Sequence, residues 1–139
     1  MSKPRDVLDS NEIILECRNL CVSYYTRAGE IPAVVDFNLT LRAGECVGLV
    51  GESGCGKTTV AMAIMQYLGQ NGAIVGGEVI YKGRNLKELS ANEIRQLRGN
   101  EIAMVYQEPM AALNPSMPMS RQLMEVPLTH EPGITEEGA

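Results

Sequence analysis

A glycine-rich segment, GESGCGKTT at residues 51–59, carries the residues of this chain best suited to chemistry. It contains the spacing G-x-x-x-x-G-K-[ST], in which a loop of backbone surrounds phosphate groups. Gly51, Gly54 and Gly56 permit backbone conformations that are closed to residues with a Cβ, so successive N–H groups can converge on an anion. The segment therefore predicts a binding site for a nucleoside triphosphate.

The other side chains of this segment have separate tasks. Lys57 can reach the β- and γ-phosphates, and Thr58 offers a hydroxyl to Mg²⁺. A helix that begins near Lys57 adds the positive end of its dipole, equivalent to roughly half a unit charge. Ser53, Cys55 and Thr59 complete the expected nucleotide-binding residues, for which ATP and Mg²⁺ are the expected cofactors. A helix N-terminus can lower a thiol pKa, but we favour Cys55 as a small residue that the loop geometry tolerates.

The same spacing can also occur by chance in an unrelated glycine-rich turn, so the flanking segments matter. Residues 46–50, CVGLV, are apolar without alternation, which is typical of a strand covered on both faces in a parallel sheet. Residues 58–69 are apolar nearly all round and close at Gly69, which predicts a buried helix. Strand, loop and helix follow in the order that a phosphate-binding loop requires.

Alternating patterns before this loop predict an antiparallel arrangement. Residues 13–26 mix alternation with β-forming residues and indicate one or two short strands, followed by a turn over residues 26–32. Residues 37–42, FNLTLR, alternate cleanly and predict a half-buried strand that is antiparallel to its neighbour.

Three further elements are expected after the loop. Residues 78–82, EVIYK, resemble a strand. Ser90 and Glu93 have the spacing of a capping box, which predicts a short surface helix near residues 91–98. Residues 102–106, IAMVY, predict a second continuous apolar strand.

A loop rich in proline and methionine follows this strand, and a helix is expected after it. Met110, Met117 and Met119 suit an adaptable contact surface, and core packing explains them equally well. Residues 120–128, SRQLMEVPL, resemble a helix, and Pro127 is expected to end it.

Two segments together resemble the ATP-binding subunits of ABC transporters, and most closely the group that imports oligopeptides, dipeptides and nickel. They are LTLRAGECVGLVGESGCGKTT at residues 39–59 and EIAMVYQEPMAALNPSM at residues 101–117. The similarity runs from about residue 12 to the end of the chain. It implies an α/β fold of the P-loop NTPase class and ABC type, in which an antiparallel β subdomain accompanies part of a parallel-sheet core.

The resemblance also implies a division of the chain and an incomplete domain. Residues 1–12 are expected to be an N-terminal tail. Residues 13–139 are expected to be the N-terminal part of an ABC ATP-binding domain, whose helical subdomain starts from about residue 110.

Further site residues follow from the resemblance. Tyr24 occupies the place of the aromatic residue that stacks on adenine, and the neighbouring Tyr25 and a purely structural strand tyrosine stay as alternatives. Gln107 matches the Q-loop glutamine, which in the family reaches Mg²⁺ and the attacking water, while a polar strand terminus is the alternative. Lys57 and Gln107 are thus the expected catalytic residues, and Thr58 and Gln107 the expected metal-binding residues.

Other elements that the family needs for ATP hydrolysis do not occur in these 139 residues. The family places a magnesium-binding aspartate and a catalytic glutamate well after Gln107, but Asp6, Asp9 and Asp36 all precede the glycine loop. The Walker B strand and the LSGGQ-type signature are missing. His130 follows Gln107 too soon to be the switch histidine, and we expect it at the surface. The chain is therefore expected to be the N-terminal half of a longer subunit, inactive by itself.

Composition excludes several classes of protein. With 45% hydrophobic and 21% charged residues the chain is not of the disordered class, and no apolar run approaches the roughly 20 residues of a membrane span. A net charge of −5 opposes sequence-independent binding to nucleic acid. The four cysteines lack CxxC spacing, which predicts reduced thiols and no zinc site.

These observations favour the ATP-binding component of an ABC importer for peptides or a related small solute, which couples ATP hydrolysis to transport in the intact subunit. The implied partners are transmembrane permease subunits, a second ATP-binding subunit and, indirectly, an extracytoplasmic solute-binding protein. No nucleic acid is expected, and the expected location is cytoplasmic, peripheral on the inner face of the cell membrane. The alternatives are a soluble ABC-type ATPase of DNA repair and a non-catalytic nucleotide-binding fragment. The sequence does not identify the solute.

Overall fold

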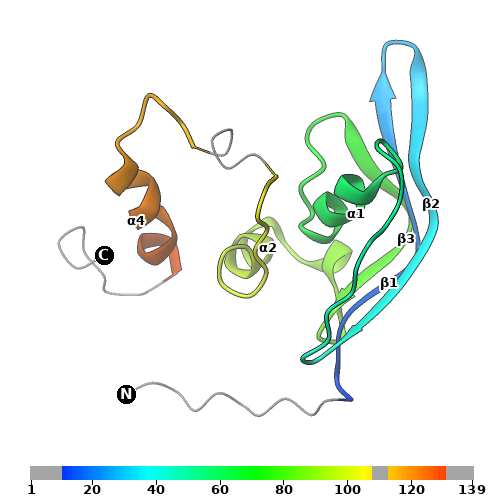
Figure 1. Cartoon of the computed structure of the whole chain (residues 1–139), viewed down its shortest axis with the longest axis horizontal. Coiled ribbons are helices and arrows are strands. Elements are labelled where there is room, and N and C mark those ends of the chain that lie inside the picture. The colour runs from blue at the N-terminus through cyan, green and yellow to red at the C-terminus, as the bar shows by residue number, and fades with distance from the viewer. Residues whose placement is uncertain (1–10, 108–112, 131–139) are drawn as a thin grey trace. The chain divides into compact units, whose positions relative to one another are not determined.

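A long antiparallel hairpin of β1 (Ile13–Thr26) and β2 (Gly29–Arg42) is the largest element of the computed structural model, which describes residues 11–107 and 113–130 (Figure 1). The chain divides into two units, one up to Leu89 and one from Ser90, and each is described by itself. No helix in the described ranges is long and apolar enough to cross a membrane.

The hairpin is tighter than its sequence indicates. Thr26 pairs with Gly29, so only two residues connect the strands. The expected turn over residues 26–32 is too long, because four of these residues already pair with β1 as part of β2. One of them is Pro32, which an edge strand accommodates because a ladder amide is not needed on its outer side.

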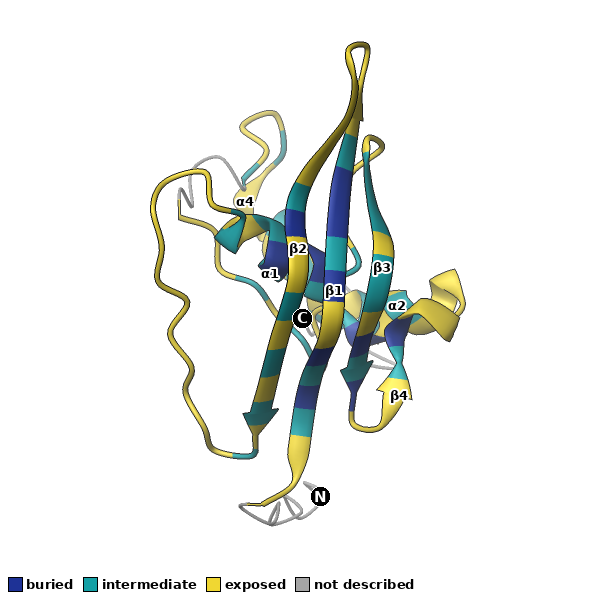
Figure 2. Cartoon of the chain, turned by 90° about the vertical axis from the view of Figure 1, so that its right-hand side faces the viewer, coloured by how far each residue is buried: buried dark blue, intermediate teal, exposed yellow. Residues whose placement is uncertain are grey.

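β3 (Gly72–Tyr81) and the short β4 (Arg84–Asn85) complete a four-stranded antiparallel sheet in the order β2-β1-β3-β4. A 3-10 turn, η1 (Leu86–Glu88), follows it. The predicted strands at residues 37–42 and 78–82 are confirmed as parts of β2 and β3, except that β3 ends at Tyr81. β1 therefore lies between two long partners, and its central residues are the best covered of the unit (Figure 2).

The core of the first unit forms between the sheet and helix α1 (Lys57–Ile64). Leu20, Val22, Val79 and Cys17 are its largest fully buried side chains. Val60 and Ala63 are the buried residues of α1, and the helix contacts β1, β2 and β3 (Figure 2). The rest of α1 is half-buried or exposed, so the expected burial on all sides is wrong for most of its turns.

α1 also ends well before Gly69. Gln66 has a φ of 52°, in the left-handed region, and its amide donates to the Ala63 carbonyl at 2.9 Å. The Tyr67 amide donates to the Met62 carbonyl at 2.8 Å. These two bonds form a Schellman motif, which satisfies the last carbonyls of the helix. The expected close at Gly69 is wrong because Gln66 adopts the left-handed conformation that usually falls to glycine.

The two continuous apolar segments do not form strands. Residues 46–50 and 102–106 have no ladder partner among the described residues beyond a single bridge between Ile102 and Arg98. Val50 is 98% exposed and Val105 is 94% exposed. A parallel strand covered on both faces exists only with neighbours that pair with it. Both predictions are therefore wrong for this structure, although the apolar composition that prompted them is real.

Helix α2 (Ala91–Leu97) opens the second unit. Glu93 N–H donates to Ser90 Oγ at 3.4 Å, and Ser90 N–H donates to Glu93 Oε2 at 2.9 Å. The predicted capping box is therefore complete, and the predicted short surface helix is confirmed.

Helix α4 (Met119–His130) continues past Pro127. Proline removes a single helical amide, and here Thr129 Oγ1 donates to the Glu125 carbonyl at 2.7 Å in the same turn. The expected end at Pro127 is wrong, since α4 runs on to His130. His130 is half-buried instead of lying at the surface, and its Nδ1 has no hydrogen-bond partner within the described ranges.

The side chain of Gln122 ties the preceding loop to α4. Its Oε1 accepts a hydrogen bond from Asn114 N–H at 2.8 Å, and its Nε2 donates to the Asn114 and Met117 carbonyls at 3.0 Å each. Met117 is half-buried and Met119 is exposed, whereas Met110 lies outside the described residues.

Leu20 offers a test of the core. Its side chain is 0% exposed, so replacing it with alanine should lower the free energy of unfolding by about 3 kcal/mol through lost burial and a new cavity. Val35→Ala is the control, because Val35 is 72% exposed and should change stability by less than about 0.5 kcal/mol. Urea denaturation followed by circular dichroism measures both. Equal losses would contradict the placement of the core.

Candidate functional site

The glycine loop leads from the exposed segment at residues 46–50 into the first turn of α1. Gly56 is the N-cap of the helix, with a φ of 93°, and Gly54 has a φ of 83°. Both values lie in the left-handed region, where a Cβ would clash with the backbone. The loop conformation thus depends on glycine at these two positions.

Space is also restricted at the two ends of the loop. A Cβ on Gly56 would lie 2.5 Å from the Ala33 carbonyl oxygen and 3.3 Å from Val34 Cγ2, so the start of α1 rests directly on β2. A Cβ on Gly51 would lie 2.5 Å from Cys55 Sγ. Gly56 is therefore required for both space and conformation, whereas a Cβ on Gly51 would require only the Cys55 side chain to move.

The first turn of α1 presents free backbone donors. Val60 N–H donates to the Gly56 carbonyl at 2.9 Å and is the first amide to bond within the helix. The amides of Lys57, Thr58 and Thr59 come before it and have no acceptor inside the helix. No side chain caps this terminus, and its first turn holds no acidic residue. An anion is the chemical group that such a terminus stabilises.

Lys57 places its ammonium group inside the loop. Its Nζ donates to the Gly51 carbonyl at 2.7 Å and to the Glu52 carbonyl at 2.6 Å, and it lies 3.4 Å from Cys55 Sγ. Neutral carbonyls are weaker partners for an ammonium than phosphate oxygens are. The loop therefore fits a phosphate chain by its donors and by the space that its glycines leave.

Tyr24 and Tyr25 differ in their surroundings. Tyr24 is half-buried, and a Cβ on Gly72 would lie 2.8 Å from its Cε1 atom. Tyr25 is 48% exposed, and its amide donates to the Asn71 carbonyl at 2.7 Å. Gly72 pairs with Tyr24 in the ladder between β1 and β3. Sequence reasoning missed Gly72, because nothing near it in the sequence shows which residue of another strand will pair with it.

A second missed contact relates Tyr24 to the loop. Val34, which Gly56 approaches, pairs with Val22 of β1. Tyr24 is two residues further along β1, on the same face and about 7 Å away by strand geometry. No pattern in the sequence marks Ala33 or Val34 as neighbours of the glycine loop, because the contact joins a strand to the start of a helix that is distant in the sequence.

The remaining expected site residues are placed as follows. Ser53 and Thr58 are exposed, and Thr59 is half-buried at the start of α1. Gln107 is exposed and belongs to the second unit, so its pairing with Thr58 stays a prediction. In the described part of the chain no three His, Cys, Asp or Glu side chains gather as metal ligands.

Comparisons with known proteins match most of the chain. Residues 34–135 match the family model described as ABC transporter. The chain is 45% identical over 119 residues to the oligopeptide transport ATP-binding protein OppD of Salmonella typhimurium, covering 86% of this chain and 35% of the relative. It is 38% identical over 130 residues to the dipeptide transport ATP-binding protein DppD of Lactococcus lactis, covering 94% and 37%. The chain thus spans little more than a third of the length of these relatives.

A solved structure shows the fold class. The post-hydrolysis dimer of the ATP-binding cassette MJ0796, bound to ADP and phosphate, superposes with a TM-score of 0.72 at 22% identity. The match covers 88% of this chain and 50% of the solved chain. The expected α/β fold of ABC type is therefore confirmed, and the chain holds part of that domain.

The cysteines allow a chemical test of this geometry. Cys46 and Cys55 are exposed, whereas Cys17 is buried. Burial raises the pKa of the Cys17 thiol from 9.0 to about 11, aided by the charge of Glu16, so it stays protonated at pH 8. We expect brief iodoacetamide treatment at pH 8 to label Cys46 and Cys55 but spare Cys17, as measured by peptide mass spectrometry.

Unfolding in urea is the control, because all four thiols should then react. The same shift predicts that the Cys17 contribution to stability is full below pH 9 and is lost between pH 9 and about 11. Labelling of Cys17 in the folded protein at the rate of Cys55 would contradict its placement.

Proposed function

Because the chain belongs to the ABC transporter family, we propose that it is the ATP-binding component of an importer for peptides or a related small solute. The observation that carries this proposal is the glycine loop at the start of α1. There the space left by Gly56, the amides of the first helical turn and the Lys57 ammonium group occur together. The names of the similar transport proteins support peptides as the solute class.

In this proposal the chain holds the nucleotide from both ends. The amides of Gly54 to Thr59 and the Lys57 ammonium bind the phosphates, with Gly51, Ser53 and Cys55 shaping the loop. Thr58 and Gln107 would hold Mg²⁺ together with phosphate oxygens and water. Tyr24 stacks on adenine, because it lies on the face of β1 that neighbours the loop. Bound ATP supplies the free energy that drives transport.

Gln107 and Lys57 are the proposed catalytic residues. Lys57 stabilises negative charge that develops on the transferred phosphate, and Gln107 orients the attacking water and contacts Mg²⁺. The exposure of Gln107 at the end of residues 102–106 is compatible with this role. We assign residues 13–139 to the N-terminal part of the ATP-binding domain after a tail at 1–12, with the helical subdomain starting near residue 110.

The proposed partners are permease subunits and a second ATP-binding subunit, with an extracytoplasmic solute-binding protein engaged indirectly. The exposed apolar residues of α4 support a protein contact: Met119, Leu123 and Val126 follow the spacing of one helix face. The proposed location is the cytoplasmic surface of the membrane. The net charge of −5 argues against nucleic acid as a partner.

Lys57→Ala tests the nucleotide site. The variant should bind ATP about one to three decades more weakly, since a charge pair near 4 Å contributes at most roughly 4 kcal/mol at an effective dielectric near 20. Lys87→Ala removes an exposed lysine from η1 and should leave binding unchanged. Isothermal titration calorimetry measures both. Parent-like affinity in Lys57→Ala would sink the site assignment.

A second test separates binding from hydrolysis. The 139-residue chain has no aspartate after the glycine loop, so we expect it to bind ATP but release no phosphate above background by itself. A coupled phosphate assay measures turnover. Steady phosphate release that disappears in Lys57→Ala would show that the chain completes a catalytic site and would contradict this expectation.

A further inference from the structure

A bulge crosses the three long strands of the sheet at one level. Asn19 of β1, Asp36 of β2 and Gly77 of β3 have φ values of 47°, 51° and 73°, all in the left-handed region. The pairing of β1 shifts between Cys17 and Leu20 on the β2 side and between Arg18 and Cys21 on the β3 side, and in both the extra residue belongs to β1. The further shifts between Leu20 and Ser23 place the extra residue on β2 or β3, so they leave the alternation of β1 unchanged. A bulge inserts an extra residue into a strand and redirects the side chains that follow.

The bulge changes which residues of β1 face the core. Leu15 and Cys17 are buried before it, and Leu20 and Val22 are buried after it. Side chains alternate along a strand, so uninterrupted alternation from Leu15 would place odd-numbered residues on this face throughout. With the extra residue, Tyr24 takes that face. Without it, Tyr25 would do so.

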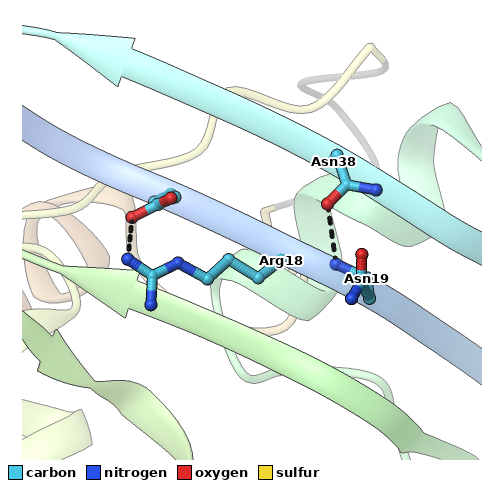
Figure 3. Close-up of polar contacts among 4 residues, drawn as sticks. Arg18, Asn19 and Asn38 are labelled. Carbon is cyan, nitrogen blue, oxygen red and sulfur yellow. Dashed lines mark hydrogen bonds and ion pairs between the residues drawn. The ribbon is translucent and has the colours of Figure 1, made fainter.

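Asn38 holds the bulge by its side chain (Figure 3). Its Oδ1 accepts a hydrogen bond from Asn19 N–H at 2.9 Å, and its Nδ2 donates to the Asp36 carbonyl at 3.0 Å. Cys21 Sγ accepts from Asp36 N–H at 3.3 Å. Two strands are therefore joined at the bulge by side chains, because the regular ladder is interrupted there.

Gly77 closes the bulge from the other side of β1. A Cβ at this position would collide with the carbonyl oxygens of Arg18 and Asn19. The positive φ of Gly77 adds a second reason for glycine, because the left-handed region disfavours other residues. The backbone of β3 can approach the bulge only where this side chain is missing.

We propose that Asn38 and Gly77 are positioning residues for adenine recognition: by stabilising the bulge at Asn19 they place Tyr24, and not Tyr25, on the face of the sheet next to the glycine loop. The inference rests on the proposed function, in which Tyr24 stacks on the base. Neither residue touches the nucleotide, so their effect is on the base and not on the phosphates. Selectivity between ATP and inorganic tripolyphosphate isolates that effect.

The experiment compares the dissociation constants of ATP and inorganic tripolyphosphate, each with Mg²⁺, for the purified full chain. Asn38→Ala removes two hydrogen bonds, to Asn19 and to Asp36, and should weaken ATP binding at least about fivefold, the effect of one net hydrogen bond, with tripolyphosphate binding changed less than about twofold. Asn38→Asp keeps the acceptor for Asn19 N–H but loses the donor to the Asp36 carbonyl, so it should restore ATP binding in part. Thr40→Ala, also exposed on β2, is the matched control and should leave both constants unchanged.

Gly77→Ala is expected to impair folding, so Asn38 carries the test, and Tyr24→Ala serves as the reference for loss of the base contact. If Asn38→Ala weakens both ligands equally, or neither, while Tyr24→Ala weakens ATP alone, the positioning inference is wrong and the proposed function stands. If the parent binds neither ligand, the proposed function fails, and the inference fails with it.

Discussion

The close approach of Gly56 to the backbone of β2 is the constraint on which the first unit depends. A side chain there would meet the Ala33 carbonyl oxygen at 2.5 Å, so α1 can begin against the sheet only with glycine at its N-cap. This contact holds the start of α1 against β2, and Val60 and Ala63 are the buried residues of the helix. The glycine loop is thus in contact with an antiparallel sheet at Gly56, and its geometry depends on where β2 lies.

The candidate site combines two kinds of hydrogen-bond donor, which differ in the partners that they now have. The Lys57 ammonium already has two carbonyl partners within the loop, whereas the amides at the start of α1 have none within the helix. Phosphate oxygens suit both groups, because they accept from amides and form charge-assisted bonds with an ammonium. A ligand of this kind would therefore exchange carbonyls for anionic oxygens at Lys57 and add partners at α1. Tyr24, the proposed base-stacking residue, lies two residues along β1 from Val22, which pairs with Val34 beside the loop.

Local chemistry explains what the sequence could predict. The glycine loop, the capping box of Ser90 and Glu93, and the alternation of residues 37–42 each depend on near neighbours, and the structure contains all three. The segments at residues 46–50 and 102–106 fail as strands because burial requires partners that the described residues do not supply. The bulge at Asn19 was equally hidden, since it depends on Asn38 and Gly77 from two other strands. Contacts between distant segments decide such features, and one sequence does not encode them in a visible pattern.

The two-residue connection between β1 and β2 has a consequence for the order of folding. Tight hairpins bring few residues together across a short loop and form within about 1–10 μs, so this hairpin is suited to form early. β3 is separated from β1 in the sequence by β2 and α1, so its pairing with β1 closes a longer loop. Gly56 can lie against β2 only when β2 is in place. We therefore expect the hairpin of β1 and β2 to form first and the glycine loop to take its shape later, once β2 is in place.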